Sequence, residues 1–408
     1  MKNIKVVIGA NYGDEGKGLM TDYLASSLKD GIVVRFNGGG QAGHTVLTED
    51  GKRHVFGNIC AGSFEGLPSY FSSFFVVNPM TFIKELSLLN DLNIFPTVYM
   101  DPNCFVTTPY DVLINQISEI VRGKSKHGSC GLGFNETITR SLADDCFRIS
   151  INDLKKEGIV KKKLEIIKNV YSSRRLKELG IANIPQRYYD LLKNENIIDN
   201  YMSDVEDMLK SITITDVNIL SSYNSIIFEG AQGLLLDQGH KYFPHVTRSN
   251  TGMKNVREIL KQLGYINQII EIIYVTRAYL TRHGEGPLPN ELKEKPYYKI
   301  EDQTNIPNPY QGILRFGFLD LNELSETINK DLKNTEGLTC TVSLAITCLD
   351  QLDKEVDYIL NSNSIKSPIA EFIQKVFDTV NVKEGYLSFG ATRENIKTIN
   401  NIKQINNM

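Results

Sequence analysis

The stretch IKVVIGANYGDEGKGLMTDYL, residues 4–24, decides the fold class of this chain. Its first five residues form an apolar run that is typical of a buried strand. A glycine-rich turn follows, GANYGDEGKG (9–18), and residues 19–24 then have helical spacing. In many α/β proteins a strand, a glycine-rich turn and a helix in this order bind phosphate through backbone N–H groups and the helix N-terminus. The sequence therefore predicts an α/β fold whose first turn binds phosphate.

This turn carries charges that a plain phosphate loop lacks. It does not match the common pattern G-x-x-x-x-G-K-[ST], because Lys17 is followed by another glycine. Two adjacent carboxylates, Asp14 and Glu15, stand inside it, and an anion in a phosphate cradle indicates a metal ion or a proton that has to move. For Glu15 we expect only a capping or supporting role. The glycines expected to line the cradle are Gly13, Gly16 and Gly18.

Length and composition place few other limits on function. The chain has 408 residues, 41% hydrophobic and 23% charged, which is ordinary for a globular protein. Its net charge of −3 gives no general attraction to nucleic acid or to an anionic membrane. No apolar run is long enough for a membrane span, and the N-terminus does not read as a signal peptide. The six cysteines have no framework spacing, so we expect reduced thiols and a cytoplasmic protein.

Strand-like and helix-like segments alternate along most of the chain. This order predicts a central, mostly parallel sheet covered by helices on both faces, similar to phosphate-loop NTPases. We expect residues 1–408 to form a single domain with a helical insertion at about 140–222, where no convincing strand is found. Further strands are expected at 31–39, 72–78, 96–101, 225–233, 268–280 and 338–350, and helices at 80–92, 109–123 and 320–332.

Three more stretches combine glycines with polar residues where a predicted strand ends. They are RFNGGGQAGHTV (35–46), FEGAQGLLLDQGHKYFPHVTRSNTG (228–252) and TRAYLTRHGEGPLPNE (276–291). Consecutive glycines indicate a backbone that approaches a ligand closely. His44 lies among small residues in the first of these stretches, which favours a functional histidine over a packed one. The other five histidines show no metal-ligand spacing, so zinc is not expected.

Taken in order, these motifs resemble those of the adenylosuccinate synthetase family. The matching segments are GDEGKG, GGQAGHTV, FEGAQG followed by HVTRSNTG, TRHGEGPLPNE, RFGFLDL and LDQLD. The resemblance extends from residue 4 to the SFGATRENI stretch at 388–396 and is weakest between 140 and 222. The first loop, followed about thirty residues later by Gly-His-Thr, is its most specific part.

The resemblance implies a Mg²⁺-dependent ligase that joins L-aspartate to C6 of IMP with GTP hydrolysis, through a 6-phosphoryl intermediate. Asp14 matches the general base of the family and its Mg²⁺ ligand, and His44 matches its general acid. Lys17 and the loop backbone would stabilise the transferred phosphoryl group, and a carbonyl near Gly43 would help to hold the metal. The family also implies a homodimer.

Other residues carry over from the family one at a time. Arg140 matches the arginine that reaches across a dimer interface to the nucleotide phosphate of the partner. Asp350 matches the carboxylate that pairs with N1 and N2 of guanine, an acceptor that suits guanine better than adenine. Arg315 is expected to hold the carboxylates of aspartate. The remaining nucleotide-contacting positions are Gly40, Gln41, Ser129, Gln232, Thr247 and Gly390, with Ser129 standing where the family has a threonine.

Several departures from the family leave alternatives open. Gly40-Gln41 replaces an Asn pair, the arginine-rich loop reads NPYQGILRFG (308–317) with Arg315 alone, and Cys348 stands in place of a lysine. Ala391-Thr392 replaces Pro-Asp. These changes would also fit the phage-type sister enzyme, which joins aspartate to dGMP with ATP or dATP. Asp14 favours IMP, because a 2-amino group beside N1 would crowd it. A nucleotide-binding regulator without catalysis is a third possibility.

Overall fold

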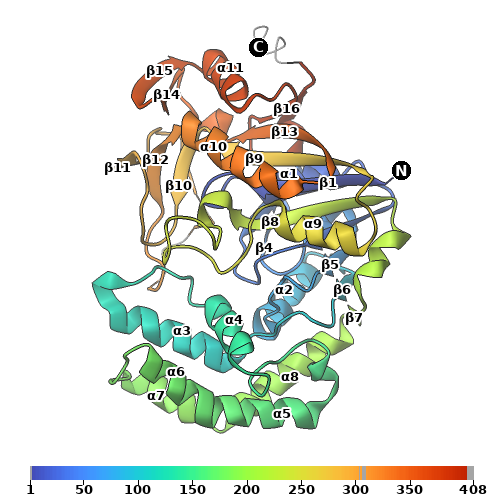
Figure 1. Ribbon diagram of the computed structural model, residues 1–408, viewed down its shortest axis with the longest axis vertical. Coiled ribbons are helices and arrows are strands. Elements are labelled where there is room, and N and C mark those ends of the chain that lie inside the picture. The colour runs from blue at the N-terminus through green and yellow to red at the C-terminus, as the bar shows by residue number, and fades with distance from the viewer. Residues whose placement is uncertain (1, 303, 306–308, 402–408) are drawn as a thin grey trace.

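The computed structural model describes residues 2–302, 304–305 and 309–401, and its largest element is a ten-stranded sheet (Figure 1). The strands run in the order β17-β16-β13-β9-β1-β8-β2-β5-β6-β7, and every neighbouring pair is parallel except β16 and β17. Their bounds are β1 (Asn3–Gly9), β2 (Gly31–Arg35), β5 (Ser69–Phe71), β6 (Val98–Met100), β7 (Thr213–Ile214), β8 (Ser225–Gly233), β9 (Ile269–Arg277), β13 (Thr339–Thr347), β16 (Gly385–Ser388) and β17 (Ile396–Ile399). The predicted mostly parallel central sheet is confirmed.

Two smaller sheets flank the large one. A hairpin is formed by β3 (His44–Leu47) and β4 (Arg53–Phe56). The second small sheet has the order β10-β12-β14-β15, with β11 pairing β12. Its strands are β10 (Tyr279–Arg282), β11 (Glu291–Leu292), β12 (Arg315–Asp320), β14 (Glu355–Leu360) and β15 (Asn363–Pro368). The predicted strand at 268–280 is therefore divided between two sheets, β9 in the large one and β10 in the small one.

Eleven α-helices surround the sheets in the described ranges, and none of these helices is long and apolar enough to span a membrane. Helix α1 follows the first turn directly, as the sequence predicted. The bounds are α1 (Lys17–Ala25), α2 (Pro79–Asp91), α3 (Pro109–Arg122), α4 (Phe134–Ala143), α5 (Glu157–Ile166), α6 (Ser172–Glu178), α7 (Gln186–Lys193), α8 (Asn196–Lys210), α9 (Met253–Gln262), α10 (Leu321–Leu332) and α11 (Ile369–Val380).

The prediction of a strand at 72–78 is wrong. Strand β5 ends at Phe71, and beyond it only Val76 and Val77 form isolated bridges, to Gly39 and Val106. The apolar side chains of this run are buried in the core without a continuous ladder. A short apolar run is typical both of a strand and of a buried irregular segment, so its periodicity could not separate the two.

Residues 140–222 are mainly helical, with α5 to α8 lying together below the sheet in Figure 1. Their buried side chains belong to one hydrophobic cluster that extends from Val46 to Met208 and includes residues of β4, β5, β6, α2 and α3. The helical segment therefore packs onto the edge of the sheet without a separate core. The two-residue strand β7 adds a last strand to that edge.

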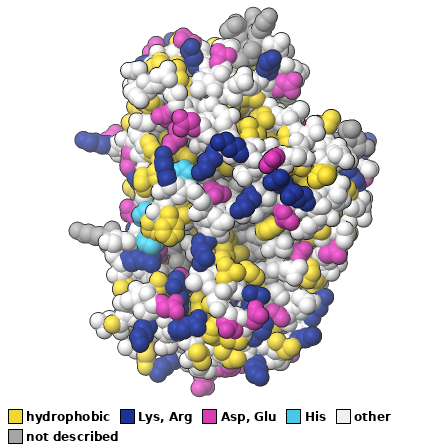
Figure 2. Space-filling view, in the orientation of Figure 1, with side chains coloured by type: hydrophobic (Ala, Val, Ile, Leu, Met, Phe, Trp, Pro, Cys, Tyr) yellow, Lys and Arg dark blue, Asp and Glu magenta, His cyan; other side chains and the backbone are white. Residues whose placement is uncertain are grey.

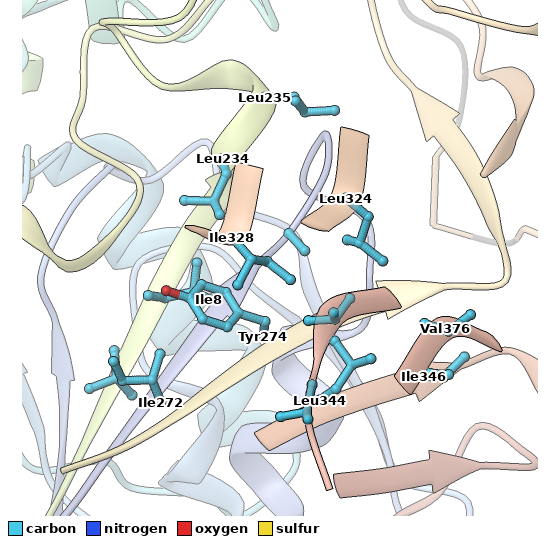
Figure 3. Packing of buried hydrophobic residues seen from close by; sticks show 14 of the residues in the cluster. Ile8, Leu234, Leu235, Ile272, Tyr274, Leu324, Ile328, Leu344, Ile346 and Val376 are labelled. Atoms are coloured by element: carbon cyan, nitrogen blue, oxygen red, sulfur yellow. The ribbon is translucent and has the colours of Figure 1, made fainter. Parts of the chain in front are cut away.

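The main core lies between the large sheet and the helices α9, α10 and α11. Alternate residues of β1 enter different clusters: Ile8 faces this core, whereas Val7 packs with α1 on the opposite face. Figure 3 shows Ile8, Ile272, Tyr274, Leu344 and Ile346 of the strands meeting Leu324 and Ile328 of α10 and Val376 of α11. Burial of each such side chain stabilises the fold by about 1.5–3 kcal/mol. This packing fixes the ends of the central strands, where the predicted site lies.

Candidate active site

The predicted site residues lie mostly in loops at one edge of the large sheet. Parallel pairing aligns Gly9 with Gly233, Arg35 with Glu229, and Thr347 with Arg277. The carboxyl ends of β1, β2, β8, β9 and β13 therefore meet at the same edge, and the glycine-rich stretches follow these ends. In open α/β sheets ligands bind in the crevice at this edge.

The first loop is organised by Glu15. Its buried carboxylate accepts hydrogen bonds from the backbone N–H of Asn11 at 3.0 Å and of Gly13 at 2.7 Å. The Nζ of Lys17 donates to the Gly13 carbonyl at 2.6 Å and lies 3.3 Å from Glu15 Oε2. Gly13 and Gly16 have φ of 116° and 94°, which favours glycine. Glu15 thus fills the inside of the turn, which agrees with the supporting role expected for it.

Asp14 has the opposite environment. Its side chain is 23% exposed, and no other described residue donates a hydrogen bond to its carboxylate. The closest cationic or titratable neighbour is His283, whose Nε2 lies 3.9 Å from Asp14 Oδ2. Asp14 therefore presents an unsatisfied carboxylate to the crevice, as a base or a metal ligand requires.

His44 is buried and held by two residues that the sequence analysis did not identify. Its Nδ1 lies 2.7 Å from Glu229 Oε1 and 2.8 Å from a terminal nitrogen of Arg35. Since an imidazole lone pair would repel the carboxylate, we assign the proton to Nδ1, donating to Glu229. Arg35, which can only donate, is then a charged neighbour of the ring that pairs with Glu229. Burial, with a contribution from Arg35, lowers the pKa of His44 to about 4, against the opposite effect of Glu229. The imidazole is therefore neutral at pH 7.

Gly18 explains why the loop departs from the common phosphate-loop pattern. A Cβ at this position would lie 2.8 Å from the Cβ of His44 and 3.0 Å from its carbonyl carbon. Serine or threonine would therefore push the start of α1 away from β3. The glycine lets His44 and the first loop lie side by side.

The predicted nucleotide-binding amides lie where two glycine loops approach each other. Gln232 has φ of 57°, and its Cα would be 3.0 Å from a Cβ on Gly13. The Oε1 of Gln232 and the Nε2 of Gln41 are buried without a hydrogen-bond partner among the described residues. Buried polar atoms are almost always paired in proteins, so these two point to a polar ligand. Gly40 lies against Asn58 and Thr81, where a side chain would not fit.

Ser129 and Thr247 lie in loops that the fold brings together. Ser129 Oγ accepts a hydrogen bond of 2.7 Å from Asn115 Nδ2, and the half-buried Thr247 donates its backbone N–H to Leu236. His127 stands two residues before Ser129, and His245 stands two residues before Thr247. The rings of these two histidines lie 5.6 Å apart. In Figure 2 the histidine side chains visible on this face lie near one another, among Lys and Arg side chains.

Arg140 is placed differently from our expectation. Its side chain is fully buried and forms a bidentate ion pair with Asp111, with Nε at 2.8 Å from Oδ1. It also donates to the carbonyls of Val106 and Phe147. To reach a partner subunit the guanidinium would have to leave a buried carboxylate, at a cost of about 3–5 kcal/mol. We therefore interpret Arg140 as a structural residue and exclude it from the site.

Arg315 is also engaged within the chain. Its Nε lies 2.7 Å from Glu291 Oε1, and a second nitrogen contacts the other oxygen of the same carboxylate. The remaining terminal nitrogen donates to the carbonyls of Gly284 at 3.0 Å and Gly286 at 2.9 Å. This guanidinium anchors the loop after β10. The N–H groups that were expected to bind the carboxylates of aspartate are therefore already engaged within the chain.

Asp350 and Gly390 follow adjacent strands. Asp350 lies in a 3₁₀ turn, η8 (Leu349–Gln351), directly after β13, and is exposed. Gly390 follows β16, the next strand in the sheet, and packs tightly against Asn395. Cys348 takes a left-handed conformation with φ of 62° at the start of the turn. The two predicted base-binding segments are therefore neighbours at the same sheet edge.

A magnesium ion would fit the donors beside the first loop. The described residues contain no cluster of three His, Cys, Asp or Glu side chains able to hold a metal. Mg²⁺ in phosphate-transfer sites is commonly held by one or two carboxylates and by substrate phosphates. Asp14 offers a carboxylate without hydrogen bonds, and Gly43 is exposed, with Val55 Cγ1 at 3.8 Å the only atom near its side-chain position.

The sequence did carry a signal for the residues that were missed. Arg35 and Glu229 are charged residues inside apolar strands that a parallel sheet buries on both faces. Such a residue must be paired, and the two face each other at 3.7 Å. Thr347, whose Oγ1 donates to the Glu15 carbonyl at 2.7 Å, had no comparable signal.

Comparisons with known proteins identify relatives along most of the chain. The chain is 30% identical to adenylosuccinate synthetase of Borrelia turicatae over 99% of its length and 90% of the relative. It is 34% identical to the Microcystis aeruginosa enzyme of the same name, covering 86% and 75% of the two chains.

Two solved structures share the fold. Fully ligated adenylosuccinate synthetase from Plasmodium falciparum superposes with a TM-score of 0.71 at 19% identity, over 97% of this chain and 99% of that one. The succinoaminodeoxyadenylate synthetase of cyanophage S-2L, bound to dGMP and dATP, gives 0.62 at 15% identity over 100% and 98%. The sequence profile of adenylosuccinate synthetase matches residues 6–407. The chain therefore belongs to the adenylosuccinate synthetase family, nucleotide-binding ligases of purine biosynthesis that form a C–N bond.

Proposed function

We propose that this ligase joins L-aspartate to C6 of IMP and converts GTP to GDP and phosphate. Asp14 would remove the N1 proton of IMP, so that O6 becomes an oxyanion and attacks the γ-phosphorus of GTP. The aspartate amine would then attack C6, and the C6–O6 bond would break to release phosphate. The product is adenylosuccinate.

The contrast between Asp14 and Glu15 carries this proposal. Glu15 is buried and saturated by loop N–H groups, whereas Asp14 is partly exposed and receives no hydrogen bond from a described residue. A general base must reach the proton that it removes, and only Asp14 is in a position to do so. Lys17 and His44, beside the same loop, would stabilise charge on the transferred phosphoryl group.

The metal would be Mg²⁺, held by the Asp14 carboxylate and the Gly43 carbonyl together with substrate phosphates. When bound, it would neutralise developing charge on the phosphate oxygens. His44 is neutral in its buried position, and an anionic phosphate beside Nε2 would favour its protonated form. A homodimer stays a prediction of the family resemblance, and Arg140 gives it no support.

The second candidate is ligation of aspartate to dGMP with ATP or dATP. It is favoured by Cys348 in place of the family lysine at the donor base, and the structurally similar cyanophage enzyme binds dGMP and dATP. Asp14 argues against it, because the 2-amino group of dGMP stands next to N1. The exposed carboxylate of Asp350 fits the two adjacent donors of guanine and so supports GTP.

Phosphate release tests both candidates. Purified protein with Mg²⁺ and L-aspartate would be given IMP, GMP or dGMP, each combined with GTP, ATP or dATP. We expect turnover with IMP and GTP that depends on aspartate. Turnover with dGMP but not with IMP would establish the second candidate, and nucleotide binding without turnover would indicate a regulator.

A further inference from the structure

The structure leaves open which residues hold the carboxylates of the amino acid. Arg315, the candidate from the sequence, already contacts both oxygens of Glu291 and two loop carbonyls. Arg282 is engaged through both terminal nitrogens, which donate to the carbonyls of Pro287 and His245, although its Nε is buried without a partner. Neither can bind another carboxylate without losing these contacts.

Arg277 differs from the other arginines near the site. It is the last residue of β9, so it lies at the carboxyl edge of the sheet, paired in register with Thr347. The side chain is half-buried, its Nε is buried without a hydrogen-bond partner, and no described carboxylate lies within 4 Å of it. Tyr279 is a hydrogen-bond neighbour of the guanidinium, but a buried Nε–H without a partner is costly, so this position is suited to an incoming anion.

The surroundings of Arg277 place it beside the proposed reaction centre. Its strongest electrostatic neighbours are Cys348 and Tyr279, followed by Asp14 and Asp302, and its guanidinium lies 5.7 Å from the ring centre of Tyr279. His283, which is 3.9 Å from Asp14, also has both ring nitrogens buried without a hydrogen-bond partner. His283 therefore lies next to the carboxylate of Asp14, and Arg277 is a further cationic neighbour of that carboxylate.

We infer that Arg277, assisted by an imidazole N–H of His283, binds a carboxylate of the amino-acid substrate. The inference rests on the proposed function, in which the substrate amine attacks a purine carbon close to Asp14. In an α-amino acid the carboxylate carbon is only two bonds from the amine nitrogen. A carboxylate must therefore lie within a few ångströms of the attacking amine, in the space that Arg277 and His283 border. A planar guanidinium is the best partner for a carboxylate, since it can donate two parallel hydrogen bonds.

A carboxylate suits this position better than the triphosphate of the donor. Arg277 already faces the negative charges of Asp14 and Asp302, so one further carboxylate is tolerable but several phosphate charges would be strongly repelled. Phosphate has its own set of donors in the first loop, near Lys17. The donor base would lie at the turn that holds Asp350, which begins at Cys348 and so borders Arg277.

Steady-state kinetics of Arg277→Gln and Arg277→Lys test this assignment. Arg257→Gln is a matched control, because Arg257 is also half-buried with an unpartnered Nε but lies inside helix α9 rather than at the carboxyl end of a central strand. We expect Arg277→Gln to raise KM for L-aspartate about 10- to 100-fold, the usual effect of a lost charge-assisted hydrogen bond, and to change KM for IMP and GTP less than about twofold. Arg277→Lys keeps the charge and should recover part of the loss.

An equal rise in KM for GTP, or an unchanged KM for L-aspartate, would overturn the assignment and leave the proposed function standing. Calorimetric titration of L-aspartate into protein saturated with IMP and GDP tests the carboxylate site when the wild type shows no turnover. If the wild type has no turnover, the proposed function fails. The carboxylate site then stands if the wild type and Arg257→Gln bind L-aspartate while Arg277→Gln does not. Absence of binding to the wild type overturns it.

Discussion

At the scale of single residues, His44 depends on a partner far away in the sequence. Glu229 is 185 positions from His44, yet its carboxylate fixes the tautomer and orientation of the imidazole. The same carboxylate also balances the buried charge of Arg35. One residue in β8 thus holds in place a proposed catalytic group at the start of β3.

Glu229→Gln is expected to lower kcat about 10- to 100-fold with little change in KM, because the imidazole loses the charge that orients it. The melting temperature should also fall, since Arg35 is left without its counter-charge. Glu271→Gln is the control: the same change in β9, where the carboxylate pairs with Lys5 instead. A Glu229→Gln enzyme with normal kcat would contradict the positioning role.

The sequence predicted the residues that act locally and missed those that act through the fold. Asp14 and His44 were found because each stands in a glycine-rich turn directly after a strand. The pairing of Glu229 with Arg35 depends on the alignment of β2 with β8, which no local pattern contains. The ion pair between Arg315 and Glu291 could not be predicted either, because it forms only when β11 pairs with β12 in the small sheet.

At the scale of elements, the close approach of α1 to β3 assembles the site. A Cβ on Gly18 would collide with His44 at 2.8 Å, so the two elements can meet only through glycine. The sequence predicted the helix after the first turn but not strand β3, where it predicted a turn at His44, and it could not show that the two segments touch. It was wrong at 72–78, where burial rather than strand pairing explains the apolar run.

Gly18→Ala is expected to lower kcat at least about tenfold and to lower the melting temperature, because the added methyl group separates His44 from the first loop. Gly158→Ala in α5 provides the comparison, since its Cβ would meet nothing within 4 Å. That variant should be neutral or more stable by up to about 1 kcal/mol, as alanine favours the helix. If the two variants had the same kcat and melting temperature, the close contact between Gly18 and His44 would be unimportant.

Helix α1 also carries a buried charge, Asp22. Its side chain is fully buried, and burial, partly offset by Arg393, raises its pKa to about 7. Because the unfolded chain ionises this group near its ordinary value of 3.8, the folded state loses stability relative to the unfolded state as the pH rises from about 4 to 7. Arg393 joins this helix to the C-terminal segment, through Asp22 and Glu65.

Asp22→Asn is therefore expected to be more stable than the wild type by about 2 kcal/mol at pH 8, with a smaller difference at pH 5. Thermal unfolding of both proteins at the two pH values measures this. A stability difference between Asp22→Asn and the wild type that is the same at both pH values would mean that ionisation of Asp22 does not destabilise the folded protein.

At the scale of the whole molecule, parallel pairing of the central strands collects the functional loops. The turns after β1, β2, β8, β9 and β13 come from positions spread over most of the chain, yet they lie at one edge of the sheet. In Figure 1 the helical segment lies below the large sheet, whereas β10 of the small sheet begins directly after the carboxyl end of β9. This architecture was predictable, because alternating strands and helices restrict the sheet to a parallel arrangement.

The central claim is that Asp14 deprotonates the purine so that O6 takes the phosphoryl group. It is tested most directly with IMP carrying ¹⁸O at position 6, in the presence of GTP, Mg²⁺ and L-aspartate. The account predicts that each released phosphate carries the label, and that Asp14→Asn lowers this transfer by about 10³-fold or more while nucleotide binding persists. Unlabelled phosphate, with the ¹⁸O retained in the nucleotide, or labelled phosphate formed at a normal rate by Asp14→Asn, would contradict it.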